Sequence, residues 1–137
     1  MKAFQGVVVA TMLGLGAGCM TPQGSEHQLE PRASLPASEG VALVSEGPNG
    51  NTALRVKVKH LALPEKVALN ATVYVVWVQP YGGRAQNVGV MKIDKDLEGS
   101  LNTVTPMKKF KVFVTPELKG EVQEPMNEEV FSADVIR

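Results

Sequence analysis

Short apolar runs separated by clusters of turn-forming residues occupy the chain from Val41 onward, and this spacing restricts the fold more than any other feature. The runs are rich in Val and also contain Leu, Phe and Thr, whereas Gly, Pro, Asn and Asp collect between them. Such a pattern is typical of β-strands joined by tight connections. It predicts strands over residues 41–44, 53–61, 72–78, 85–93, 100–104, 110–115 and 130–136.

Two of these predicted strands show how their faces are covered. Aliphatic and basic side chains alternate through residues 53–61, which predicts a strand with one buried face and one solvent-exposed face. Residues 72–78 are apolar on both faces and rich in β-branched and aromatic types, which predicts a central strand covered on both sides. Trp77, on this strand, is expected to lie in the core of the domain.

No amphipathic helix interrupts the predicted strands, which excludes a regular alternation of strands and helices. Only residues 63–67 predict a single helical turn, because Pro64 is favoured at a first helical position. About seven short strands with turn clusters between them predict an all-β fold. An antiparallel immunoglobulin-like β-sandwich is the first choice, and a small β-barrel is the second.

Residues 20–40 differ in composition from the strands that follow. Prolines, glycines and serines recur in them, the apolar residues show no periodicity, and only Leu29 and Leu35 are large aliphatics. Such a segment cannot bury enough apolar surface to offset the entropy lost on ordering it. We therefore predict a flexible, moderately extended tether ahead of the folded domain.

The first 18 residues have the three-part layout of an export signal, with Lys2 near the start, an apolar middle, and small residues before Cys19, the only cysteine. A membrane-spanning helix needs about 20 mostly apolar residues, and this stretch is shorter. A plain secretory signal that leaves Cys19 as a free thiol is the closer alternative. A lone cysteine cannot close an internal disulfide, and an exposed thiol is a liability in an oxidising compartment, so a modified Cys19 is favoured.

The series Leu15-Gly16-Ala17-Gly18-Cys19 resembles the lipobox of bacterial lipoproteins, although Gly16 stands where a larger aliphatic residue is usual. The resemblance implies that the thiol of Cys19 receives a diacylglyceryl group and that the signal is cut before Cys19, whose new amino group is then acylated. Two or more acyl chains give stable anchoring. By the sorting pattern of the same family, Met20 implies transfer to the outer membrane, facing the periplasm.

These predictions divide the chain into three parts. Residues 1–18 form the signal peptide, residues 19–40 comprise the acylated cysteine and the flexible tether, and residues 41–137 form the β-sandwich domain.

An ordered series of segments follows within residues 73–135. It comprises Tyr74-Val75-Val76-Trp77-Val78-Gln79-Pro80, the Gly82-Gly83 turn, Val88-Gly89-Val90, residues 110–117 and Pro125. The series resembles the extracytoplasmic domain of anti-sigma-K-type factors, which implies a β fold outside the cytoplasm. Those factors normally carry a sigma-binding segment and a spanning helix first, whereas an export signal and a tether stand here, and Thr115-Pro116-Glu117 reverses the usual Glu-Pro order. The resemblance therefore implies fold and location, but not inhibition of a sigma factor.

Residue types used for metal binding and catalysis are few and scattered. The only histidines are His27 and His60, and neither has a partner at a ligand spacing. Met91 and Met107 are expected to fill the core rather than to bind copper. No serine lies in a Gly-x-Ser-x-Gly context with a paired histidine. We therefore expect a protein that is not an enzyme and that holds no metal and no cofactor.

The chain has 14 basic and 14 acidic residues, and this neutrality argues against general nucleic-acid binding. The acidic turn at residues 94–98 contains Lys95 and lacks a full calcium ligand series, so it is expected to be a solvated turn. Two basic groups would make a strip for anionic lipid or polysaccharide if their strands adjoin, and solvated faces with cross-strand charge pairs are the plainer alternative. The residues of this candidate interaction surface are Arg55, Lys57, Lys59, Lys108, Lys109 and Lys111.

Taken together, these features predict a non-enzymatic, lipid-anchored protein of the cell envelope that acts as an interaction or structural module. Its expected partners are the membrane, through the lipidated Cys19, and an envelope protein or anionic polymer. The alternative is a periplasmic carrier of a ligand or metal, in which Tyr74, Trp77 or Tyr81 lines a pocket.

Overall fold

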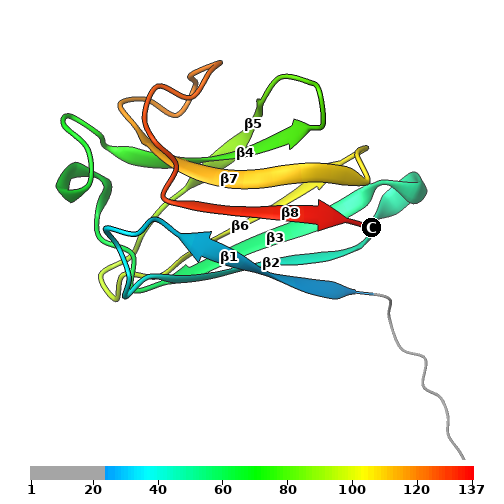
Figure 1. The fold of residues 1–137 in the computed structure, drawn as a ribbon, viewed down its shortest axis with the longest axis horizontal. Helices are drawn as coiled ribbons and strands as arrows, with labels where there is room; N and C mark the ends of the chain where they lie inside the picture. Colours follow the sequence, from blue (N-terminus) through cyan, green and yellow to red (C-terminus); the bar gives the residue numbers. More distant parts are fainter. Residues whose placement is uncertain (1–23) are drawn as a thin grey trace, which may run out of the picture.

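The computed structural model describes residues 24–137, and strands make up nearly all of its regular structure (Figure 1). The strands are β1 (Ser25–Pro31), β2 (Glu39–Glu46), β3 (Thr52–Lys59), β4 (Val73–Pro80), β5 (Gln86–Met91), β6 (Gly99–Thr105), β7 (Lys109–Glu117) and β8 (Phe131–Ile136). Two single 3-10 turns, η1 (Pro48–Gly50) and η2 (Pro64–Lys66), interrupt the described part of the chain. The all-β prediction and the helical turn are confirmed, with eight strands in place of about seven.

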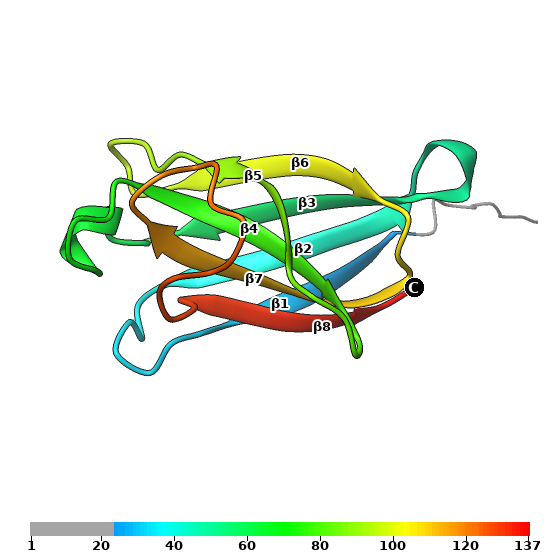
Figure 2. The ribbon, with the colours of Figure 1, turned by 90° about the horizontal axis from the view of Figure 1, so that it is seen from above.

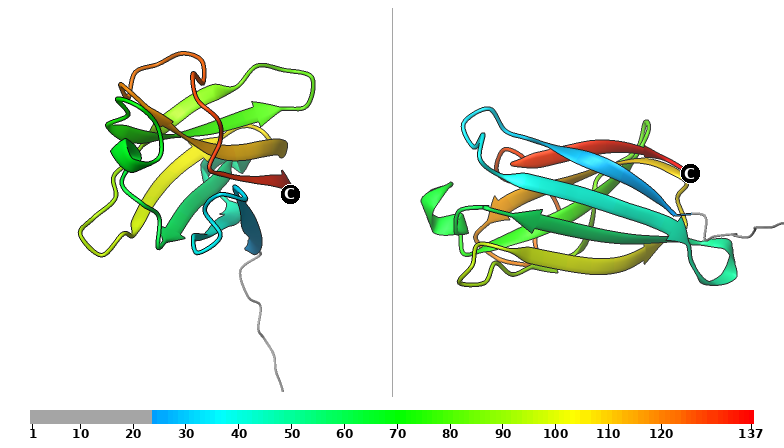
Figure 3. Two further views of the ribbon diagram at one scale, coloured as in Figure 1. Left: turned by 60° about the vertical axis from the view of Figure 1, so that its left-hand side comes forward. Right: turned by 90° about the horizontal axis from the view of Figure 1, so that it is seen from below.

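All eight strands belong to one antiparallel sheet in the order β5-β4-β7-β8-β1-β2-β3-β6. The sheet curls so that its two halves, β5-β4-β7-β8 and β1-β2-β3-β6, face each other (Figures 2 and 3). β5 and β6, the first and last strands of this order, also approach each other. A Cβ atom added at Gly89 on β5 would lie 3.2 Å from the methyl carbons of Leu101 on β6. The eight strands thus form one curled antiparallel sheet, whose halves are joined through β1 and whose edge strands β5 and β6 approach each other.

The main core lies between the two halves and receives side chains from both. The predicted alternation in β3 is confirmed, because Leu54, Val56 and Val58 are buried while the basic residues between them are exposed. From the other half, Tyr74 and Phe110 enter the same core with no exposed surface.

A second, smaller core covers the outer face of β4, so the prediction that this strand is buried on both faces is confirmed. Val75, Trp77 and Phe113 form it, and Val122, from the connection between β7 and β8, packs against them. Trp77 is fully buried in a core, as expected, but in this second core rather than in the one between the two halves of the sheet. Successive side chains of a strand point to opposite faces, so Trp77 points away from the core that its neighbour Val76 enters.

The predicted tether over residues 20–40 is wrong for the part that the structure describes. β1 lies within it and pairs with β2 from Ser25 to Leu29, then with β8 at Glu30 and Pro31. The segment is ordered because backbone pairing with β2 and β8 stabilises it, although its own sequence has few apolar side chains to bury. Leu29 is the only side chain of β1 that is buried: it is 3% exposed and belongs to the main core.

Replacing Leu29 by alanine tests whether β1 is part of the folded domain. Leu29→Ala should lower the free energy of unfolding by about 2–4 kcal/mol, because it leaves a cavity in the main core. The measurement is urea unfolding followed by circular dichroism. Gln28→Ala, at the exposed neighbouring position, serves as the control and should change stability by less than about 0.5 kcal/mol. Equal, near-zero effects of both variants would contradict the placement of β1.

Candidate functional site

The fold divides the candidate interaction surface that the sequence suggested. Three of its cations lie on β3, whereas Lys109 and Lys111 lie on β7 and Lys108 immediately precedes β7. β8, β1 and β2 stand between β7 and β3 in the sheet order. The two groups of basic residues therefore do not adjoin, and the continuous basic strip that the sequence suggested does not form.

The three cations of β3 form a row on the outer face of the sheet, and we call this set the β3 row. Arg55, Lys57 and Lys59 occupy alternate exposed positions, which places neighbours about 6.7 Å apart along the strand. Within residues 24–137 none of the three forms an ion pair. Arg55 Nε donates a hydrogen bond to Asn102 Oδ1 at 2.6 Å, which fixes the guanidinium on the face of the sheet.

Half-buried aliphatic residues of β2 lie directly beside the β3 row. Val41 is the register partner of Lys57, and Leu43 is the register partner of Arg55. An open groove along this face is lined by Val41, Leu43 and three lysines, Lys57, Lys59 and Lys92. Four carboxylates line it as well: Glu26, Glu39, Asp94 and Glu98. The outer face of β2 and β3 therefore combines the unpaired cations of the β3 row with an apolar strip, and acidic residues border the groove.

The basic residues near β7 have different surroundings. Lys111 Nζ lies 2.8 Å from Glu129 Oε1 and 5.0 Å from the centre of the Phe113 ring, so its charge is compensated locally. This contact ties β7 to the connection that follows it. Lys109 is exposed and takes part in no ion pair among the described residues.

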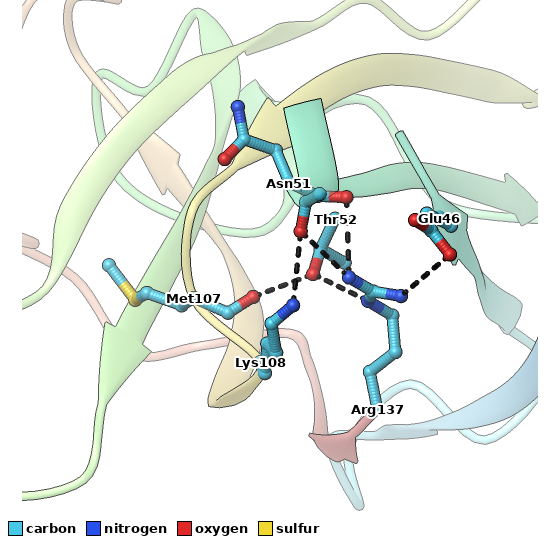
Figure 4. Close-up of polar contacts among 7 residues, drawn as sticks. Glu46, Asn51, Thr52, Met107, Lys108 and Arg137 are labelled. Atoms are coloured by element: carbon cyan, nitrogen blue, oxygen red, sulfur yellow. Dashed lines mark hydrogen bonds and ion pairs between the residues drawn. The ribbon is translucent and has the colours of Figure 1, made fainter. Parts of the chain in front are cut away.

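Lys108 belongs to a polar cluster that the sequence did not indicate (Figure 4). Its Nζ donates to the carbonyl of Gly50 at 3.0 Å, and Arg137 Nη2 donates to the same carbonyl at 3.0 Å. Arg137 Nε donates to Thr52 Oγ1, which in turn donates to the carbonyl of Met107. The cluster joins the β2–β3 connection, the β6–β7 turn and the residue after β8, which lie far apart in the sequence.

A buried hydrogen-bond chain fixes the second core. Trp77 Nε1 donates to Thr115 Oγ1 at 2.8 Å, and Thr115 Oγ1 donates to Glu117 Oε2 at 2.6 Å. Glu117 Oε2 also accepts the backbone N–H of Met126 at 3.0 Å. Trp77 stacks on Phe113 with ring centres 6.2 Å apart. The fully buried Glu117 carboxylate thereby holds the β7–β8 connection over the indole.

The aromatic residues suggested for a carrier pocket do not converge. Tyr74 is buried in the main core, where its hydroxyl donates to the carbonyl of Ala62. Burial raises the pKa of the Tyr74 phenol above its ordinary value, so the hydroxyl stays protonated and remains a donor. Trp77 lies in the second core, and Tyr81 is exposed in the turn after β4. These three side chains therefore share no pocket.

The described residues include no group of three or more His, Cys, Asp or Glu side chains arranged to hold a metal ion. His27 lies on β1, and His60 follows β3 with an exposed side chain. Across residues 24–137 no helix is long and apolar enough to span a membrane. Cys19, the predicted lipidation site, lies outside the described residues.

Comparison with known proteins returns no family model, no curated protein and no solved structure that matches this chain.

The hydrogen-bond chain beneath the β7–β8 connection makes a direct prediction. Thr115→Val should lower stability by about 1–3 kcal/mol, because it leaves the buried indole N–H without an acceptor and removes a donor from Glu117. Urea unfolding and the emission wavelength of Trp77, the only tryptophan, report the change. Ser132→Ala, at the register partner of Phe113, is the control and should be nearly neutral. A Thr115→Val variant as stable as the control would refute the role of this chain.

Proposed function

We propose that this protein is a non-enzymatic component of a bacterial cell envelope, held to the outer membrane on its periplasmic side by acyl chains on Cys19. The observation that carries this proposal is the position of the only cysteine, directly behind a cationic start, a short apolar stretch and small residues. The likeness of residues 73–135 to an extracytoplasmic domain supports the same location. The folded domain serves as an interaction module.

For the partner of that module we propose an anionic polymer of the envelope, bound on the outer face of β2 and β3. The support is the β3 row, whose three cations are regularly spaced and free of ion pairs among the described residues. The half-buried Val41 and Leu43 beside it add apolar surface that a sugar ring can cover. An extended polymer suits a row along a strand better than it suits a concave pocket.

The anchor is tested by removing its thiol. Cys19→Ala should abolish acylation, and the protein should then move from the membrane fraction to the soluble fraction or remain unprocessed. Mass spectrometry of the chain and fractionation of cells give the two readouts. An unchanged mass and an unchanged fractionation in the variant would exclude the lipoprotein proposal.

The polymer-binding face is tested by charge reversal. Lys57→Glu combined with Lys59→Glu should weaken binding of the mature protein to dextran sulfate, the probe polymer, by about tenfold at low salt, because each lost cation contributes about 1 kcal/mol or less at an exposed site. Lys95→Glu combined with Lys119→Glu, on the β5–β6 and β7–β8 connections and outside the groove, is the control of equal charge change. The affinity of the control variant for dextran sulfate, measured with the protein in detergent micelles, should equal that of the unmodified protein.

Two results would overturn the choice of partner. Equal loss of binding in both double variants would show a non-specific charge effect. Recovery from solubilised membranes of a protein whose binding depends on Lys57 and Lys59, without polymer binding, would assign the face to an envelope protein.

A further inference from the structure

The strands run between two ends of the domain (Figures 1 and 2). These two ends differ in charge. We call one the basic end: it comprises the connections at residues 47–51, 81–85 and 106–108, the strand residues that adjoin them, and Arg137. We call the opposite end the acidic end: it holds the other connections, residues 32–38, 60–72, 92–98 and 118–130, which contain eight carboxylates and five lysines and arginines. The basic end instead carries four cations, Arg84, Lys108, Lys109 and Arg137, and one side-chain carboxylate, Glu46.

Three of the four cations of the basic end are not neutralised within the described part of the protein. Arg84 and Lys109 are exposed and form no ion pair with any residue from 24 to 137. Lys108 donates to a backbone carbonyl, which orients the cation but leaves its charge uncompensated. Arg137, by contrast, forms an ion pair with Glu46, whose Oε1 lies 4.0 Å from Arg137 Nη1.

Exposed apolar side chains accompany these cations. Tyr81 is 59% exposed in the turn after β4, and Ile136 is 61% exposed at the end of β8. An aromatic ring and an aliphatic side chain beside lysines and arginines is the combination that suits the headgroup region of a bilayer.

The chain enters the domain at this same end. β1 begins at Ser25, and Gly24 lies against Val44 and Ser45 near the end of β2. Cys19 is five residues before Gly24, and five fully extended residues span at most about 18 Å. Because β1 is folded into the sheet, an acylated Cys19 would hold Gly24, where the chain enters the basic end, within that distance of the bilayer surface. The acidic end would lie farther away by the length of a strand such as β2, about 26 Å.

We propose that the basic end binds the anionic phospholipid headgroups of the leaflet that holds Cys19. This inference rests on the proposed lipid anchor and adds an orientation to it: the acidic end points away from the membrane, and the β3 row stands along the side of the domain. The attraction between the cations and the anionic headgroups falls off within a Debye length, because salt screens charges that lie farther apart. The short link matters because it keeps the cations close to the surface.

The test uses the mature, acylated protein reconstituted into vesicles of phosphatidylcholine, with or without phosphatidylglycerol. Acylation occupies Cys19, so a cysteine introduced by Gln86→Cys at the basic end or by Leu69→Cys at the acidic end is the only free thiol. Each variant carries a fluorescent donor, and headgroup-labelled lipid is the acceptor. Energy transfer from position 86 should rise about twofold when phosphatidylglycerol is present and should fall back at high salt, whereas transfer from position 69 should stay low.

Charge reversal completes the test. Arg84→Glu combined with Lys109→Glu should abolish the rise at position 86. Both residues lie outside the hydrogen-bond networks that hold the loops, so circular dichroism should remain unchanged. Lys92→Glu combined with Lys95→Glu, at the acidic end, should leave the rise intact. Equal transfer from both positions in all vesicles, or a rise that survives reversal of Arg84 and Lys109, would overturn the proposal.

The mass of the mature chain separates this proposal from the one on which it rests. A diacylated or triacylated chain that stays on neutral vesicles but shows no dependence on phosphatidylglycerol refutes the orientation alone. A chain without acyl groups refutes the anchor, and the orientation with it.

Discussion

Strand β1 lies between β2 and β8 and thereby joins the two halves of the sheet, and the rest of the structure depends on this pairing. Its register runs along β2 from Ser25 to Leu29 and passes to β8 at Glu30 and Pro31. Gly40 on β2 makes the junction tight, because a Cβ there would lie 2.9 Å from Leu29 Cδ1 and 3.2 Å from the Phe131 ring. Without β1 the main core would be open along one side.

The same pairing determines where the chain enters the domain. A flexible segment reaching to residue 40 would let the domain rotate freely at a distance from its anchor. With β1 in the sheet, five residues separate Cys19 from Gly24, and they lead to the end of the domain that carries Arg84, Lys108 and Lys109. The proposed orientation on the membrane therefore follows from one strand pairing and the charges around it.

Local sequence patterns predicted most strands but neither their order nor β1. The alternation in β3 and the two apolar faces of β4 could be predicted, because the pattern of apolar and polar residues within one strand indicates which of its faces are buried. β1 has one buried apolar residue, Leu29, and two flanking partners supply its stability, so its own composition resembles that of a tether. The position of Trp77 depends on which face of β4 packs against the other half of the sheet. A strand that is apolar on both faces does not indicate which face this is.

For the candidate surfaces too, features within one strand could be predicted from the sequence, whereas features that depend on the order of the strands could not. The exposure of Arg55, Lys57 and Lys59 was predictable because it follows from alternation within one strand. Their separation from Lys109 and Lys111 was not, because it depends on the strand order between β3 and β7. The basic end is assembled from connections remote in sequence, and the burial of Glu117 depends on the backbone N–H of Met126, which only the folded β7–β8 connection brings near.

Hydrogen exchange of the backbone amides of β1, measured on the mature protein without vesicles, tests the central claim most directly. If β1 is part of the sheet, its paired amides exchange as slowly as those of β2 and β8, because they open only with the domain. Exchange of the β1 amides at the rate of an unstructured peptide, beside a protected β2 and β8, would contradict the account. The domain would then begin at Glu39, and the link to Cys19 would be too long to hold the basic end at the membrane.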